Sequence, residues 1–113
     1  MTVLNRLKLE LGNQEYYTDE EYTQLLIENS LVATDDYNKS TMQRNLLLTV
    51  LDVLTTVSND VDKMRSVSTE FENLGSAYKF LEQRIDKLRE QIANVPTAED
   101  DNSSNVFSLM FTE

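Results

Sequence analysis

The chain has 113 residues, which suits a single small domain. It carries 20 acidic and 10 basic residues, so its net charge is −10 at neutral pH. This charge repels nucleic-acid phosphates and argues against a non-specific DNA- or RNA-binding surface, but it is compatible with a channel wall or a DNA mimic.

The residue types that are missing limit the chemistry further. The sequence has no cysteine and no histidine, which removes thiol nucleophiles, disulfides, zinc thiolates and the commonest general base. It contains no Gly-rich phosphate loop and no recognisable pairing of a nucleophile with a base, so we expect no enzyme, cofactor or metal. We also expect no membrane span, because no run of about 18 apolar residues occurs. We expect no signal peptide, because "MTVLNRLKLE" lacks an apolar h-region.

The first predicted element is a short amphipathic helix in residues 2–12. Val3 or Leu4, Leu7 and Leu11 recur at helical spacing, and Gly12 is a natural stop.

A second helix is predicted to begin after Thr18 and to continue to about Ala33. Thr18 and Glu21 have the spacing of a capping box, and acidic residues fill the first turn, where the helix dipole favours them. The inner side of this helix is predicted to hold Tyr22, Leu25, Leu26, Asn29, Val32 and Ala33.

The third predicted helix is the most apolar and the central one. Ser40 and Gln43 suggest a second, weaker capping box at its start. Its apolar residues recur at steps of three and four, which favours helix over strand: Leu46, Leu47, Val50, Leu51, Leu54 and Val57.

The pattern weakens in residues 60–74. Val67, Thr69 and Phe71 alternate with polar residues, which permits a short extended segment. Asp60 and Asp62 have the spacing that opens a calcium loop, but the glycine and glutamate that such a loop requires do not follow.

The last predicted helix carries a strict heptad seam and ends at Pro96. The seam can pack inside the bundle or against another subunit, and packing inside the bundle is the default. The prediction is therefore an all-α domain, a bundle of about four helices in residues 1–96, with an extended tail in residues 97–113. The seam consists of Tyr78, Leu81, Ile85, Leu88 and Ile92.

The tail combines an acidic linker, residues 97–105, with an apolar end that we call the hook. The hook can fold back on its own domain, or it can dock on a partner or a neighbouring copy. A spacer of this length favours docking elsewhere, in an extended form, because simple fold-back does not need it. The hook consists of Val106, Phe107, Leu109, Met110 and Phe111.

The five tyrosines, including Tyr16, Tyr17 and Tyr37, are candidates for an interface, because tyrosine combines apolar area with a hydroxyl group. Equally, some of them can simply cover the ends of the bundle. We predict that outer helix faces around Tyr22 and Tyr78 make subunit contacts.

The order of elements resembles the head–tail connector proteins of long-tailed bacteriophages, also called adaptor or head-completion proteins. The resemblance covers roughly residues 3–94 and includes "LNRLKLELG", "TDEEYTQLLIENS", "DDYN" and "FLEQRIDKLREQI". The sequence departs from the family pattern in residues 60–74, where the third helix runs into an irregular stretch.

The resemblance implies a structural virion protein without catalysis. Such proteins form rings of about twelve copies beneath the portal at the capsid vertex, around the DNA channel. Their C-terminal segments reach the portal protein, and the other face of the ring receives a tail-side neck protein. The hook would then anchor the ring, in a virion assembled in the host cytoplasm, and DNA would pass through without tight binding.

A second interpretation is a small acidic helical regulator, or a DNA mimic, that binds a basic protein surface. A connector is a stoichiometric component of virions. A regulator is monomeric or dimeric and absent from them.

Overall fold

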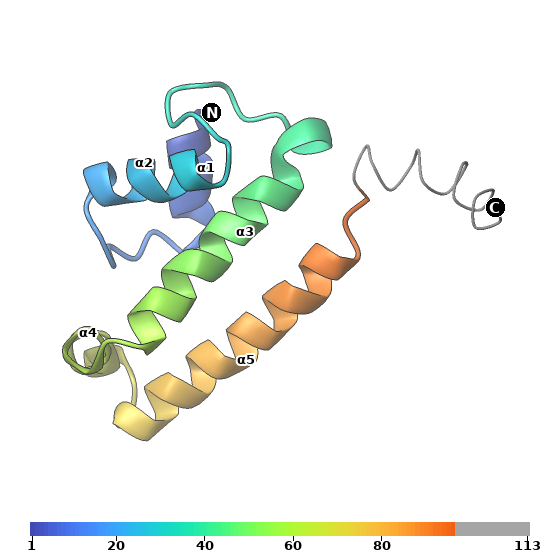
Figure 1. Cartoon of the computed structure of the whole chain (residues 1–113). Helices are drawn as coiled ribbons and strands as arrows, with labels where there is room; N and C mark the ends of the chain where they lie inside the picture. Colours follow the sequence, from blue (N-terminus) through green and yellow to red (C-terminus); the bar gives the residue numbers. More distant parts are fainter. Residues whose placement is uncertain (97–113) are drawn as a thin grey trace, which may run out of the picture.

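The computed structural model describes residues 1–96, and this part of the chain is helical, with no strand (Figure 1). The all-α prediction is confirmed, with one more α-helix than expected. The linker, the hook and the predicted extended tail lie outside the described residues. The helices are α1 (Val3–Glu10), α2 (Asp19–Glu28), α3 (Lys39–Ser58), α4 (Val61–Val67), the single 3-10 turn η1 (Ser68–Glu70), and α5 (Leu74–Ala93).

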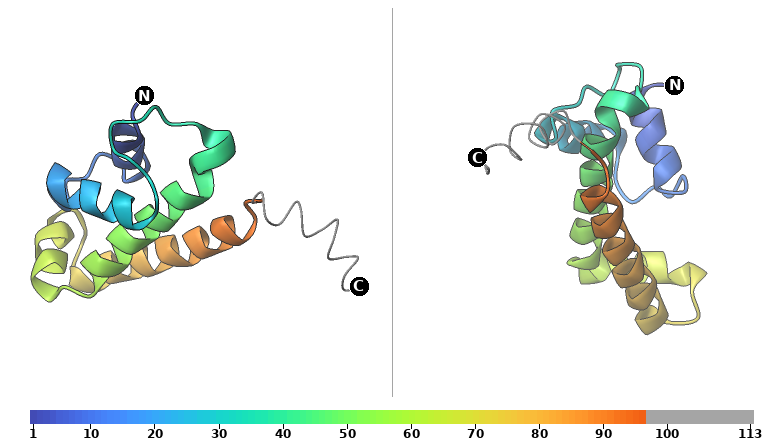
Figure 2. Two further views of the ribbon diagram at one scale, coloured as in Figure 1. Left: turned by 45° about the horizontal axis from the view of Figure 1, so that its top comes forward. Right: turned by 90° about the vertical axis from the view of Figure 1, so that its right-hand side faces the viewer.

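Helix α3 is the centre of the domain, as its apolar sequence predicts. It contacts each of the other four α-helices. Helix α5 lies beside α3 over most of its length and runs in the opposite direction, while α1 and α2 pack against another side of α3 (Figures 1 and 2). The bundle therefore consists of one long helix pair with a smaller N-terminal unit against it.

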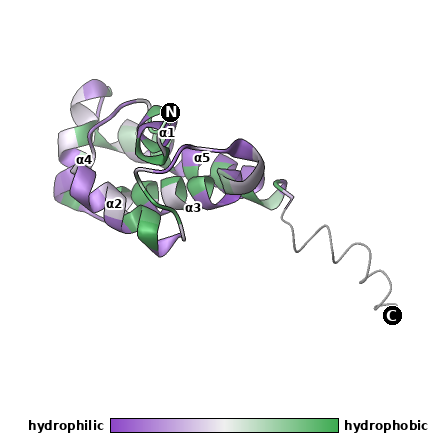
Figure 3. Cartoon of the chain, turned by 90° about the horizontal axis from the view of Figure 1, so that it is seen from above, coloured by the Kyte–Doolittle hydropathy of each residue, from purple (hydrophilic) through white to green (hydrophobic). Residues whose placement is uncertain are grey.

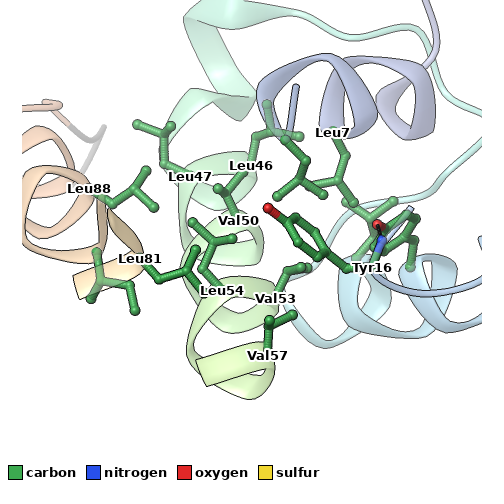
Figure 4. Close-up of a cluster of buried hydrophobic side chains, with 14 of the residues drawn as sticks. Leu7, Tyr16, Leu46, Leu47, Val50, Val53, Leu54, Val57, Leu81 and Leu88 are labelled. Atoms are coloured by element: carbon green, nitrogen blue, oxygen red, sulfur yellow. Dashed lines mark hydrogen bonds between the residues drawn. The ribbon is translucent and has the colours of Figure 1, made fainter. Parts of the chain in front are cut away.

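The heptad seam of α5 packs inside its own chain. Leu81 and Leu88 point toward Leu47 and Leu54 of α3 (Figure 4), and the seam residues from Leu81 onward are buried. Hydrophobic and hydrophilic residues alternate around the long helices (Figure 3), as expected for helices with one buried side. Burial of each leucine contributes about 1.5–3 kcal/mol of hydrophobic stabilisation. This packing supports the default prediction for the seam.

Helix α2 ends at Glu28 and not at Ala33, so its predicted length is wrong. Ser30 adopts a left-handed conformation with φ 64°. The amide of Leu31 then donates to the carbonyl oxygen of Leu26 at 2.9 Å, which is the closing bond of a Schellman motif. The apolar stripe continues past this turn, which is why periodicity alone misplaces the end of the helix.

The segment after α2 leaves the helix and pairs with the N-terminus. The amide of Val3 donates to the carbonyl oxygen of Asp35 at 2.8 Å, and the amide of Tyr37 donates to that of Met1 at 2.9 Å. The start of a helix has amide groups without intrahelical partners, and this pairing supplies partners for two of them, those of Val3 and Leu4. Residues that the periodicity assigned to α2 and beyond therefore pair with the N-terminus instead.

The predicted extended segment is also wrong, because residues 61–70 form α4 and η1. The Asp60 side chain accepts a hydrogen bond of 3.1 Å from the amide of Lys63, so Asp60 caps α4. Met64 is fully buried and anchors the short helix to the core. The alternation of Val67, Thr69 and Phe71 does not mark a strand, since tertiary packing outweighs such a short pattern.

One of the two predicted capping boxes is confirmed. Thr18 accepts a hydrogen bond from the Glu21 amide at 3.2 Å, and Glu21 accepts one from the Thr18 amide at 2.9 Å. The box predicted at Ser40 and Gln43 is wrong. Asn38 caps α3 instead, accepting from the Ser40 amide at 3.0 Å, which places Ser40 already inside the first turn.

Candidate functional site

Two arginines from different helices share one carboxylate between α1 and α5. Arg6 Nη1 lies 3.0 Å from Glu10 Oε1, and Arg84 Nη2 lies 3.0 Å from Glu10 Oε2. The Glu10 side chain is only 20% exposed, so this pairing is shielded from water more than a surface ion pair. Because two positive charges share one negative charge, the group keeps an excess positive charge within an acidic protein.

On one side of this ion group lies a cleft of about 300 Å³, which we call the apolar cleft. Phe80 is 47% exposed at its rim and lies against Phe71, with 5.3 Å between the ring centroids. Gln14 bridges to Glu70 at 3.4 Å. The lining consists of Glu10, Leu11, Gly12, Gln14, Tyr16, Leu54, Val67, Glu70, Phe71, Phe80, Leu81 and Arg84.

On the other side lies a cleft of about 400 Å³, which we call the terminal cleft because Pro96, the last described residue, lines it. Arg6 and Glu10 belong to its wall, so the ion group separates the two clefts. We refer to the two clefts, which share Glu10, together as the α1–α5 trough. The terminal cleft is lined by Arg6, Glu10, Tyr37, Lys39, Gln43, Leu46, Leu47, Gln91, Asn94, Val95 and Pro96.

One face of α5 follows the trough from end to end. Phe80 and Arg84 line the apolar cleft and Gln91 lines the terminal cleft. Lys87 is exposed and lies between Arg84 and Gln91 on the same side of α5, because residues three and four positions apart share one side of a helix. The face therefore runs from an apolar end through two basic residues to the end of the described chain.

The prediction that Tyr22 offers a subunit contact is contradicted by its burial. Its side chain is 1% exposed, so it has almost no surface for another subunit. Its hydroxyl group instead accepts a hydrogen bond from the Tyr16 amide at 3.1 Å and donates one to the Gln14 carbonyl oxygen at 3.1 Å. Tyr78 is half-buried against the core, so part of its ring faces solvent.

Four tyrosines that are buried or half-buried have raised pKa values. Burial raises the pKa of Tyr16, Tyr17, Tyr22 and Tyr37 above the usual value of 10, because the ionised form loses hydration. These hydroxyl groups therefore keep their protons to higher pH than a free tyrosine, and that of Tyr22 makes the hydrogen bonds described above. The opposite shift occurs at Glu21, whose pKa is lowered by the hydrogen bond from the Thr18 amide.

The net charge of the described chain lies entirely in its N-terminal unit. Residues 1–38 contain eight acidic and two basic residues, which gives −6, whereas residues 39–96 contain eight of each. The acidic unit also has exposed apolar side chains, with Ile27 56% and Val32 53% exposed. The domain thus has two chemically different surfaces.

Residues 1–96 contain no group of three or more acidic side chains arranged to hold a metal ion. In the same part of the chain, no helix combines the length and the apolar character needed to cross a membrane.

Comparisons with protein-family models, with curated proteins and with solved structures gave no match for this chain.

The sequence did not single out the residues of the trough. Phe80 lies off the heptad seam, and a large apolar residue at such a position is a usable signal of an exposed contact surface. Glu10 and Arg84 are 74 residues apart, and no local pattern connects them. The hook residues lie outside the described part of the chain, so their predicted role stays a prediction.

Proposed function

We propose that this protein is a structural connector of a bacteriophage neck, which joins the capsid portal to the tail as a homo-oligomeric ring around the DNA channel. The resemblance in residues 3–94 motivates the proposal, and the all-α bundle agrees with it. In this role the protein is a non-enzymatic virion component of about twelve copies. Its partners are the portal protein, through the hook, and a tail-side neck protein.

The observation that carries the ring proposal is the separation of charge within the domain. Subunits that join head to tail need two different, complementary surfaces, in contrast to a two-fold dimer. Residues 1–38 offer an acidic surface with exposed Ile27 and Val32, and residues 39–96 offer a neutral one with exposed basic residues such as Lys79. Contact between unlike surfaces of neighbouring copies avoids repulsion between their acidic units.

The decisive experiment measures the protein in purified phage particles and in a deletion variant. A connector is present in fixed, multiple copies at the portal vertex, whereas one or two copies per vertex contradict a ring. Deletion of residues 106–113 is expected to leave the bundle folded and to give heads without tails. Tailed, infectious particles from the deletion would show that the hook is not the portal anchor.

The acidic N-terminal unit also favours a second candidate function. No basic residue occurs between Lys8 and Lys39, so this stretch can bind a basic protein surface, as a regulator or DNA mimic does. Such a protein is absent from purified virions and acts as a monomer or dimer. The mass spectrum of particles therefore separates the two candidates.

A further inference from the structure

The described chain ends inside the trough. Pro96 lines the terminal cleft, and from there the α5 face returns to the apolar cleft at Phe80. Phe80 and Ala93 are separated by about 20 Å of helix at 1.5 Å per residue. The residues that follow Pro96 therefore start at one end of a trough whose other end is apolar.

We propose that the α1–α5 trough is the binding site for the tail of the same chain, with the acidic linker along α5 and the hook in the apolar cleft. This inference does not rest on the connector role, because it concerns the isolated protein. If the protein is a connector, the trough holds the hook until the portal displaces it.

The length of the linker fits this path. Residues 97–105 extend to at most about 30 Å at 3.3 Å per residue. The hook can therefore reach Phe80 with the linker nearly extended along α5, antiparallel to the helix. Return to the same chain along this path does need a spacer, in contrast to the simple fold-back considered from the sequence, because a much shorter linker leaves the hook short of Phe80.

The chemistry of the apolar cleft fits an aromatic occupant. Phe80 is 47% exposed and tilted by 42° against Phe71, while Leu81 and Leu54 line the same cleft. A half-exposed phenylalanine pair loses unfavourable hydration when another aromatic or aliphatic side chain covers it. The hook offers Phe107, Leu109 and Phe111, which lie on one side when the segment is extended.

The charges of the linker and of α5 fall in matching positions. An extended linker places Asp100 and Asp101 about 13–17 Å beyond Pro96. Lys87 and Arg84 precede Ala93 by about 9 and 14 Å along the axis of α5. The two aspartates therefore pass beside Lys87 and beside an arginine that shares Glu10 with Arg6.

The same chain is the expected occupant, and a second copy is not. A short flexible linker gives the hook an effective concentration in the millimolar range next to its own trough. A second copy reaches that concentration only in very concentrated solution or in a preassembled ring. Docking within one chain is therefore independent of dilution.

The absence of tryptophan from the sequence allows a direct test. Phe107→Trp and Phe111→Trp, made separately in the full chain, each introduce a single fluorescent reporter into the hook. At least one reporter is expected to show blue-shifted emission and several-fold protection from acrylamide quenching, unchanged on dilution. In that variant Phe80→Glu is expected to abolish both effects, while the control Ile27→Glu, which adds the same charge outside the trough, leaves them unchanged.

A matched pair on α5 tests the electrostatic part. Lys87→Glu is expected to raise quenching of the protected reporter, whereas Lys79→Glu, an exposed position on another side of the helix, leaves it unchanged. Circular dichroism confirms that each variant is folded. The proposal is overturned if both tryptophans emit as solvent-exposed tryptophan does. It is also overturned if Phe80→Glu leaves the protection from quenching unchanged. Protection that disappears on dilution assigns the hook to a second copy and also overturns it. None of these results depends on portal binding.

Discussion

The hydroxyl group of Tyr22 donates a hydrogen bond of 3.1 Å to the carbonyl oxygen of Gln14 and so ties the loop before α2 to the helix itself. The same oxygen accepts hydrogen bonds from the amides of Tyr16 and Tyr17, at 3.1 and 3.3 Å. One buried side chain thus satisfies three backbone groups. This accounts for a tyrosine in the core, where a phenylalanine would fill the same space.

Tyr22→Phe is expected to destabilise the protein by about 1–3 kcal/mol, because it leaves the buried amide of Tyr16 without its partner. The measurement is the free energy of unfolding from urea denaturation. Tyr78→Phe is the matched control, and we expect its effect to stay within about 0.5 kcal/mol, as for a side chain at the surface. Equal losses in the two variants would contradict this role for the Tyr22 hydroxyl group.

The ion group between α1 and α5 is expected to stabilise their packing. A double-mutant cycle with Glu10→Gln and Arg84→Gln should give a coupling energy of about 1–2 kcal/mol, since the pair is shielded and hydrogen-bonded. The exposed pair Asp86 and Arg89, 3.8 Å apart, is the comparison and should give a coupling of only a few tenths of a kcal/mol, about the low end for exposed pairs. Similar couplings in the two cycles would show that the ion group has no special role.

Two positions with positive φ should respond to substitution in opposite directions. Ser30 has φ 64°, so Ser30→Gly relieves backbone strain and is expected to stabilise by about 0.5–1 kcal/mol. Gly12 has φ 68° and open space around its Cβ position, so Gly12→Ala should destabilise by about 1 kcal/mol through the backbone alone. Thermal unfolding of both variants checks the signs. A stabilising Gly12→Ala would contradict the left-handed turn after α1.

The buried tyrosines predict alkaline unfolding. Their pKa values are raised in the folded state, so the unfolded chain releases these protons at lower pH than the folded one. Their contribution to stability is fully present below pH 10, the usual pKa, and is lost as the pH rises through the folded values. Tyrosinate absorbance should therefore rise together with the loss of helical circular dichroism. Ionisation of Tyr16 and Tyr22 without unfolding would contradict their burial.

The acidic charge predicts that the purified protein has no measurable affinity for DNA at physiological salt. The net charge is −10 per chain, and a ring of about twelve copies carries about −120, so DNA is repelled at close range. Fluorescence anisotropy with labelled duplex DNA is the measurement. Tight binding that weakens with added salt would contradict the prediction.

The helical character, the central position of α3 and the buried side of α5 could all be predicted from the sequence. These features rest on apolar residues repeated at helical spacing, such as Leu81, Ile85 and Leu88, and a local period survives any arrangement of the helices. The capping box of Thr18 and Glu21 was predictable for the same reason, since its partners are three residues apart.

The end of α2 and the helical state of residues 61–70 could not be predicted from the sequence, because they depend on packing between distant parts of the chain. The segment after α2 pairs with the N-terminus, α4 is held by the burial of Met64, and Glu10 pairs with Arg84, 74 residues away in the sequence. The same holds for the α1–α5 trough, whose walls come from distant parts of the chain. The physical reason is that these contacts join residues with no local relationship, so their free energy appears only when the helices pack.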